Sequence, residues 1–209
     1  MNQALLEEVI NHPDSSLLRF TVEQYQRLLD DGVLADGGPF ELLDGYIFHK
    51  NRADLGVSEM IHSPRHSHRL AKLNLILQNA ATSLGLDLYC QLPLQLAPFS
   101  VPEPDFCLAV PLAPEAMERH LEPSDVVLTV EVALSSLKRD REGKLPLYAK
   151  AGVIEYWIVN LADLQLEIYR QPDRTNSIYQ SKQVLRTMDR VTITGSNGKT
   201  VEMPVVDLL

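Results

Sequence analysis

The 209-residue chain has the length of one ordinary domain, and its 45% apolar and 22% charged residues are typical of a globular protein with a buried core. The formal net charge of −9 counts against a protein that coats nucleic acid non-specifically, because phosphate binding draws most of its affinity from Lys and Arg. No window approaches the roughly 20 apolar residues of a membrane span, and the first residues lack the pattern of a secretory signal. We therefore expect a cytoplasmic protein without a membrane partner.

The residue patterns in the first half of the chain predict two helices and a strand. Thr21 and Gln24 form a capping-box pattern at the start of a helix, and residues 41–48 have the pattern of a strand with a turn in it. A longer helix is predicted between Pro64 and Gly85, because apolar residues recur there at spacings of three and four. These residues are Leu70, Leu73, Leu77, Ala80 and Leu84.

Strands dominate the next part of the chain. Residues 88–96 alternate partly, and residues 105–110 are apolar after an initial acid. Residues 126–133 are apolar on both faces apart from two polar positions, which is typical of a central strand that is covered on both sides. A helix is predicted from about Lys138 to Ala151, followed by another buried strand over residues 155–160.

The remainder, from Leu164 onward, has the pattern of short antiparallel strands, with a hairpin signal at Asn197-Gly198. The order helix, three strands, helix, strand indicates an α/β fold with a mixed central sheet. A helix and a strand precede this core, and a C-terminal β extension follows it. We expect one domain over residues 1–209, with the core at about 62–160 and the extension at 161–209.

Two carboxylates are the first candidates for chemistry. Asp105 opens an apolar strand, and Glu131 lies inside the most apolar strand of the chain, where a charge is costly unless it is paired. Two neighbouring carboxylates favour either a shared proton or a hard cation. The residues alone leave a second interpretation equally open, in which Glu131 forms a buried salt bridge with Lys or Arg.

Lys144 is the third candidate, because it shares a helical face with Tyr148 and Ala151. A lysine on that face would point its ammonium toward the sheet and toward Glu131. The competing interpretation is an ion pair with Asp140, four residues earlier, on a solvated face. Pro146 makes the helical phase before it uncertain.

Other motifs are weaker candidates for a functional site. His62 and His68 are interpreted as solvated or helix-entry residues, while His66 is retained as a possible substrate contact. Residues 195–200 superficially resemble a phosphate-binding loop, but they lack its first glycine and join two strands, so we interpret them as a hairpin. The two cysteines form no CxxC pair, which argues against a zinc ribbon.

Six segments of this chain occur together, in this order, in a known family. They are Glu41-Leu42-Leu43-Asp44-Gly45, His66 with Leu73 and Leu77, Pro104-Asp105, Val130-Glu131-Val132, Asp140 with Lys144-Leu145-Pro146-Leu147-Tyr148, and Gly152-Val153-Ile154-Glu155-Tyr156-Trp157-Ile158-Val159. On these segments the chain resembles the Uma-type family of restriction-endonuclease-like proteins, over about residues 21–209. The family is assigned to the PD-(D/E)XK nuclease superfamily, so the resemblance implies a restriction-endonuclease-like αβββαβ core.

The resemblance also implies roles for individual residues. Asp105 and Glu131 would bind Mg²⁺ or Mn²⁺, and Glu41 is added as a further candidate metal ligand from outside the core strands. Lys144 would replace the usual lysine two positions after the glutamate, where this chain has Ala133. The catalytic set is then Asp105, Glu131 and Lys144.

The implied activity is metal-dependent hydrolysis of DNA phosphodiester bonds, with no organic cofactor. Substrate phosphates would meet a group of basic residues, and a homodimer would suit cleavage of both strands. The predicted substrate-binding residues are His66, Arg69, Lys138, Arg139 and Arg141. The rival hypothesis is a catalytically silent module of the same fold that binds nucleic acid or a protein partner.

Overall fold

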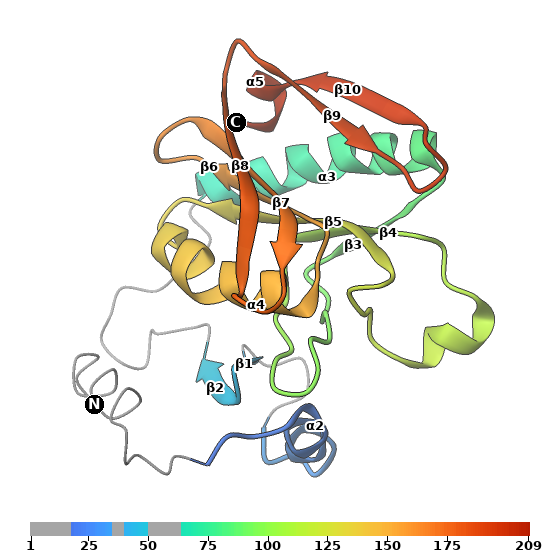
Figure 1. Cartoon of the computed structure of the whole chain (residues 1–209), viewed down its shortest axis with the longest axis vertical. Helices are drawn as coiled ribbons and strands as arrows, with labels where there is room; N and C mark the ends of the chain where they lie inside the picture. Colours follow the sequence, from blue (N-terminus) through green and yellow to red (C-terminus); the bar gives the residue numbers. More distant parts are fainter. Residues whose placement is uncertain (1–17, 35–39, 50–63) are drawn as a thin grey trace.

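The computed structural model describes residues 18–34, 40–49 and 64–209, with the backbone alone for residues 64–67. Its centre is a six-stranded sheet in the order β3-β4-β5-β6-β7-β8 (Figure 1). The strands are β3 (Asp87–Cys90), β4 (Phe106–Ala109), β5 (Val126–Ala133), β6 (Glu155–Asn160), β7 (Gln165–Asp173) and β8 (Ile178–Arg186). β5 and β6 are parallel and all other neighbours are antiparallel, so the sheet is mixed, as predicted.

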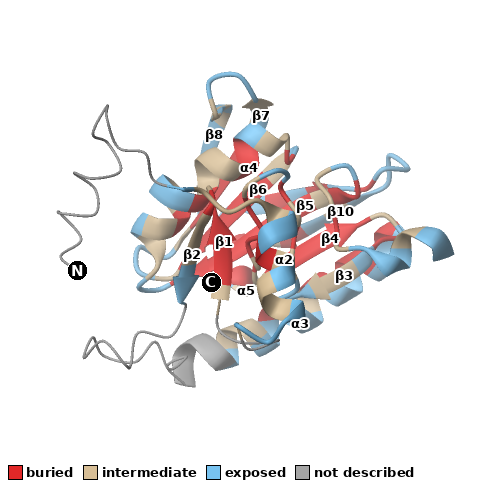
Figure 2. Cartoon of the chain, turned by 90° about the horizontal axis from the view of Figure 1, so that it is seen from below, coloured by how far each residue is buried: buried red, intermediate tan, exposed pale blue. Residues whose placement is uncertain are grey.

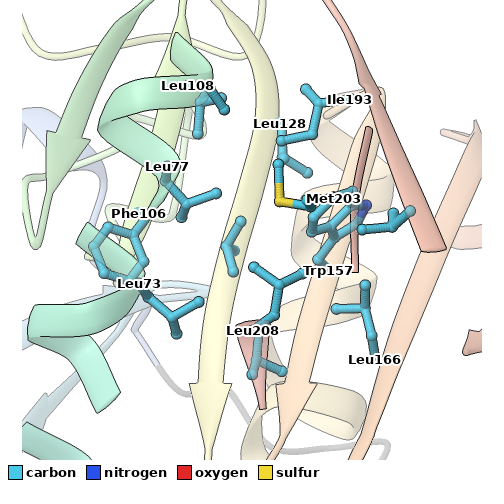
Figure 3. Packing of buried hydrophobic residues seen from close by; sticks show 14 of the residues in the cluster. Leu73, Leu77, Phe106, Leu108, Leu128, Trp157, Leu166, Ile193, Met203 and Leu208 are labelled. Carbon is cyan, nitrogen blue, oxygen red and sulfur yellow. The ribbon is translucent and has the colours of Figure 1, made fainter. Parts of the chain in front are cut away.

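One face of the sheet is covered by α3 (Pro64–Leu84), the hairpin β9 (Arg190–Thr194)–β10 (Thr200–Pro204) and the short helix α5 (Val205–Leu208) (Figure 1). The predicted apolar positions of α3 face inward: Leu73, Leu77, Ala80 and Leu84 are all buried. They pack with side chains of β4–β7 and of the C-terminal segment into the largest apolar cluster (Figure 3). Its labelled members in that view are Leu73, Leu77, Phe106, Leu108, Leu128, Trp157, Leu166, Ile193, Met203 and Leu208.

The opposite face carries the helical segment between β5 and β6, in which a π-helix (Arg139–Lys144) runs directly into α4 (Leu145–Ala151). We predicted one regular helix here, and Pro146 explains the difference. Proline has no N–H, so the α-helical bond to residue 142 cannot form, and the preceding N–H of Leu145 bonds to the carbonyl of Asp140, five residues back. Gly152, at φ +88°, ends the helix as predicted.

An N-terminal unit, which we define as α2 (Val22–Asp30), β1 (Phe40–Leu43) and β2 (Tyr46–His49), lies on the same side of the sheet as α4 (Figure 1). The capping box of Thr21 and Gln24 is present, and the predicted strand with a turn is a hairpin that reverses at Asp44-Gly45. The unit has its own small apolar cluster around Tyr25, Leu42 and Val101. β1 is largely buried (Figure 2), and its residues contact the rest of the fold: Leu42 forms a bridge with Val101.

Two predicted features differ in extent. The strand expected over residues 88–96 ends at Cys90, because Gln91 adopts a positive φ of 51°, and Leu94 and Leu96 form only isolated bridges. In the C-terminal part, β7 and β8 are long and continue the main sheet, and only β9 and β10 form a separate pair. A short 3₁₀ helix (Pro114–Glu118) lies between β4 and β5. Among the helices in the described ranges, none has the length and apolarity that crossing a bilayer demands.

Candidate active site

Lys144 and Glu131 meet on the α4 side of the sheet. The ammonium nitrogen of Lys144 lies 2.8 Å from Oε1 of Glu131, and the hydroxyl of Tyr148 donates to the same oxygen at 3.0 Å. All three side chains are buried. The face shared by Lys144 and Tyr148 therefore points at Glu131 as the sequence predicted, and the alternative of a solvated pair between Lys144 and Asp140 is wrong.

Asp105 directly precedes the neighbouring strand, β4. The register of β4 and β5 pairs Phe106 with Val130, and continuing it by one residue sets Asp105 opposite Glu131. Oδ2 of Asp105 accepts a hydrogen bond from the backbone N–H of Val132 at 2.8 Å. Asp105 is half-buried whereas Glu131 is 5% exposed, so Asp105 forms the more accessible edge of the site.

Glu41 reaches the same place from β1. Its Oε1 lies 3.0 Å from the ammonium of Lys144 and accepts the backbone N–H of Glu103 at 2.8 Å. Glu41 is 2% exposed. We call Glu41, Glu131 and Lys144 the lysine cluster; in it a single ammonium contacts two buried carboxylates.

The site gathers four carboxyl groups, those of Glu41, Asp105, Glu131 and Asp140, around the ammonium of Lys144. Burial raises the pKa of Glu131 to about 8, and Asp140, Asp105 and Glu41 add to the rise although Lys144 opposes it. Burial alone would lower the pKa of Lys144, but Glu131, Glu41 and Asp140 outweigh it, so the pKa lies above its ordinary value and the amine stays protonated. Burial also raises the pKa of Tyr148, which keeps its hydroxyl a donor. A surplus of buried carboxylates attracts a cation.

Comparison with models of known protein families identifies the family of this chain. The model of the Uma2 family, described as "Putative restriction endonuclease", matches residues 22–197. The chain belongs to the Uma2 family.

The fold of this Uma2 protein is similar to that in the crystal structure of a putative nuclease belonging to DUF820 from Anabaena variabilis. The TM-score is 0.64 at 14% sequence identity, and the match covers 90% of this chain and 97% of the other. At that identity the likeness establishes the restriction-endonuclease-like fold alone. None of the curated proteins compared with the chain matches it.

The donor atoms of this Uma2 protein are compatible with a divalent cation held by two carboxylates. Both hydrogen bonds to Glu131 go to Oε1, and Oε2 accepts none from the part of the chain that the structure describes. Oδ1 of Asp105 has only a long contact of 3.4 Å with the side-chain amide of Gln91. Within the described residues, no three His, Cys, Asp or Glu side chains gather closely enough to hold an ion. A cation held there by two carboxylates would complete its coordination shell with water and substrate oxygens.

Asp140 is a member of the site that the sequence did not single out as functional. It is 1% exposed, and its Oδ2 accepts the hydroxyl of Ser136 at 2.6 Å, while Oδ1 has no hydrogen-bond partner among the described residues. Burial raises the pKa of Asp140, and Lys144 acts against that rise. The signal in the sequence was its position four residues before Lys144, which we considered only as part of the competing interpretation of a surface pair.

The predicted basic residues are placed differently from one another. Arg141 donates through Nε to Oε2 of Glu167 on β7 at 3.0 Å and is thus engaged in a pair away from the lysine cluster. Lys138 is exposed, with its Nζ 3.7 Å from Oε2 of Glu142. Arg139 is half-buried, and its Nε has no hydrogen-bond partner in the ranges that the structure describes. Arg69 is half-buried on α3, and the side chain of His66 lies outside the described residues.

Proposed function

We propose that this Uma2 protein is a metal-dependent endonuclease that hydrolyses DNA phosphodiester bonds, with Mg²⁺ or Mn²⁺ held by Asp105 and Glu131. The observation that carries the proposal is the buried ammonium of Lys144, 2.8 Å from Glu131 on the face where Asp105 stands opposite. The family description and the fold of the Anabaena protein support the same class of activity.

Each residue of the proposed site has a physical task. Val132 fixes one oxygen of Asp105 through its N–H, and Tyr148 fixes one oxygen of Glu131, so each carboxylate keeps its other oxygen for a ligand. When bound, a divalent cation supplies a Lewis acid that lowers the pKa of water and offsets charge on the phosphate. The ammonium of Lys144 would orient the attacking water or stabilise the charge that develops on the phosphoryl oxygens.

DNA would approach from the exposed edge of the site at Asp105. Lys138 and Arg139, at the start of the π-helix, are the proposed phosphate contacts on this side of the sheet, whereas Arg69 and His66 belong to α3, which covers the opposite face. Such a local basic face can bind a short stretch of backbone despite the net charge of −9.

Cleavage of supercoiled plasmid with Mg²⁺, Mn²⁺ or EDTA tests the proposal. The wild type should nick and linearise the plasmid only with a divalent cation, and Asp105→Ala and Lys144→Ala should each reduce the rate by at least 100-fold. Circular dichroism of each variant checks that it is folded. Cleavage that survives both substitutions would reject this site.

A second candidate function is a silent module, and one observation favours it. Lys144 already satisfies an oxygen on each of two buried glutamates, and such a cluster can serve as a structural ion pair without any metal. A silent module would bind DNA equally well with EDTA or Mg²⁺ and would leave plasmid intact. Anisotropy with a labelled duplex, run beside the cleavage assay, separates the two functions.

A further inference from the structure

We infer that Glu41 is a positioning residue for Lys144 and is not a ligand of the proposed metal. This inference rests on the proposed function and assigns Glu41 a place in it. It departs from the role that the family resemblance implied for this residue, and it comes from the contacts of the lysine cluster.

The ammonium of Lys144 occupies the place where a cation bridging Glu41 and Glu131 would sit. It lies 3.0 Å from Oε1 of Glu41 and 2.8 Å from Oε1 of Glu131. A metal bound to both of these oxygens would coincide with the ammonium, whose side chain is 3% exposed. Two cations cannot share that space, because like charges at such a distance repel strongly in a buried site.

Glu41 is also held in the orientation that serves the lysine. The oxygen that contacts Lys144 accepts the N–H of Glu103 as well, at 2.8 Å. The next residue, Leu42, forms an antiparallel bridge with Val101, and the N–H of Val101 donates to its carbonyl at 2.7 Å. The backbone around Glu41 is therefore anchored on the segment that leads to Asp105, and its carboxylate is aimed at Lys144.

Glu41 gives Lys144 a carboxylate partner that would not be bound to the metal. A divalent cation on Glu131 would take up the negative charge that Lys144 now faces. Glu41 would then remain as the carboxylate that keeps the ammonium charged and in place beside the phosphate. The N-terminal unit thereby supplies a residue that the αβββαβ core lacks.

The test combines one crystal structure with two double-mutant cycles on the full chain. Crystals soaked in Mn²⁺ locate the ion by anomalous scattering. Urea unfolding without metal and single-turnover DNA cleavage at saturating Mn²⁺ are then measured for the wild type, Glu41→Gln, Lys144→Met and the double variant. Glu23→Gln, on the exposed face of α2 in the same unit, is the matched control.

We expect Mn²⁺ beside Asp105 and Glu131, with Glu41 still on Lys144. Glu41→Gln should lower the urea midpoint of the wild type but raise that of Lys144→Met, where it removes a buried negative charge that no longer faces an ammonium. Glu41→Gln should slow cleavage at least tenfold, and the double variant should cleave no more slowly than Lys144→Met. Glu23→Gln should change neither measurement.

Mn²⁺ bound by the Glu41 carboxylate, or losses in cleavage that add across the double variant, would overturn the inference. A wild type that cuts no DNA would reject the proposed function instead. In that case the ion position and the unfolding cycle would still decide whether Glu41 serves the lysine.

Discussion

Oδ2 of Asp105 accepts the backbone N–H of Val132 at 2.8 Å, which links the start of β4 to the residue that follows Glu131. The bond joins two neighbouring strands beyond the pair of Phe106 and Val130, where their ladder ends, and it sets the orientation of the Asp105 carboxylate. An amide oxygen can accept the same bond, so the charge of Asp105 can be removed without losing this contact.

Asp105→Asn should therefore keep its fold but lose its response to Mn²⁺. Differential scanning fluorimetry of the wild type should show stabilisation of about 5–10 °C at a Mn²⁺ concentration near 100 times Kd, because the ion binds only the folded state. The variant should melt near the metal-free wild type at every Mn²⁺ concentration. Asp87→Asn, at an exposed position of β3, should respond as the wild type does. An equal shift in Asp105→Asn would place the ion elsewhere.

Tyr148→Phe should reduce both stability and cleavage. It removes the hydroxyl that donates to Glu131 at 3.0 Å, which should lower the free energy of unfolding by about 1–2 kcal/mol. The Glu131 carboxylate, a proposed metal ligand, then loses a hydrogen bond that orients it. The matched control is Tyr179→Phe, which removes a hydroxyl that donates to the carbonyl of Val153 at 2.8 Å. That variant should lose about 1 kcal/mol in urea unfolding and keep its cleavage rate. Equal cleavage rates in the two variants would contradict a role for Tyr148.

Glu167→Gln should make the free energy of unfolding depend less on pH in the acidic range. Burial alone would raise the pKa of Glu167, but hydrogen bonds from Arg141, Tyr169, Asn160 and Lys182 lower it to about 2 from an ordinary 4.5. The carboxylate thus contributes stability that is fully present above about pH 4.5 and is lost as the pH falls toward 2. The difference corresponds to about 3 kcal/mol. Urea unfolding of both proteins between pH 2 and 6 measures it, and curves that run parallel would refute the assignment.

Gly45→Ala should destabilise the protein more than Gly32→Ala. Both glycines have positive φ, 85° and 67°, so each substitution costs about 1–2 kcal/mol in backbone strain. A Cβ on Gly45 would also lie 2.6 Å from Cβ of Arg19, whereas one on Gly32 meets nothing within 4 Å among the described atoms. We expect a further 1–3 kcal/mol or so for Gly45→Ala in urea unfolding. Equal losses would show that the β1–β2 turn can shift to make room.

Lys138→Gln should weaken DNA binding without unfolding the protein. Lys138 is 74% exposed at the start of the π-helix and lies 3.7 Å from Glu142, so its removal should cost little stability. If it contacts phosphate, the slope of log K against log salt should fall by about 1 in anisotropy titrations. Lys199→Gln, on the exposed β9–β10 turn across the sheet, is the control and should leave the slope unchanged.

The sequence was most informative where the pattern of neighbouring residues indicates how a residue is buried. β5 and β6 have the predicted bounds, Val126–Ala133 and Glu155–Asn160, because an apolar run with both faces covered has few alternatives. The contact of Lys144 with Glu131 followed from the helical face that Lys144 shares with Tyr148. These predictions required only local periodicity and the cost of an unpaired buried charge.

Contacts between distant segments were not accessible in the same way. The pair of Arg141 with Glu167 depends on how β7 continues the sheet, and no spacing in the sequence indicates it. The ion pair of Glu41 with Lys144 depends likewise on how the β1–β2 hairpin docks. The competing interpretation, which placed Asp140 and Lys144 on a solvated face, used α-helical geometry where Pro146 imposes a π-helix.

The attachment of the N-terminal hairpin has a consequence for the order of assembly. Glu41 and Lys144 are far apart in the sequence and meet only where the hairpin docks, so we expect this contact to form late in folding. The hairpin contributes no strand to the six-stranded sheet, and the N-terminal unit has its own small core, so we expect the unit to open locally while the sheet persists. Amide hydrogens of β1 should then exchange faster than those of β5. Inactivation on mild heating should precede the loss of the sheet.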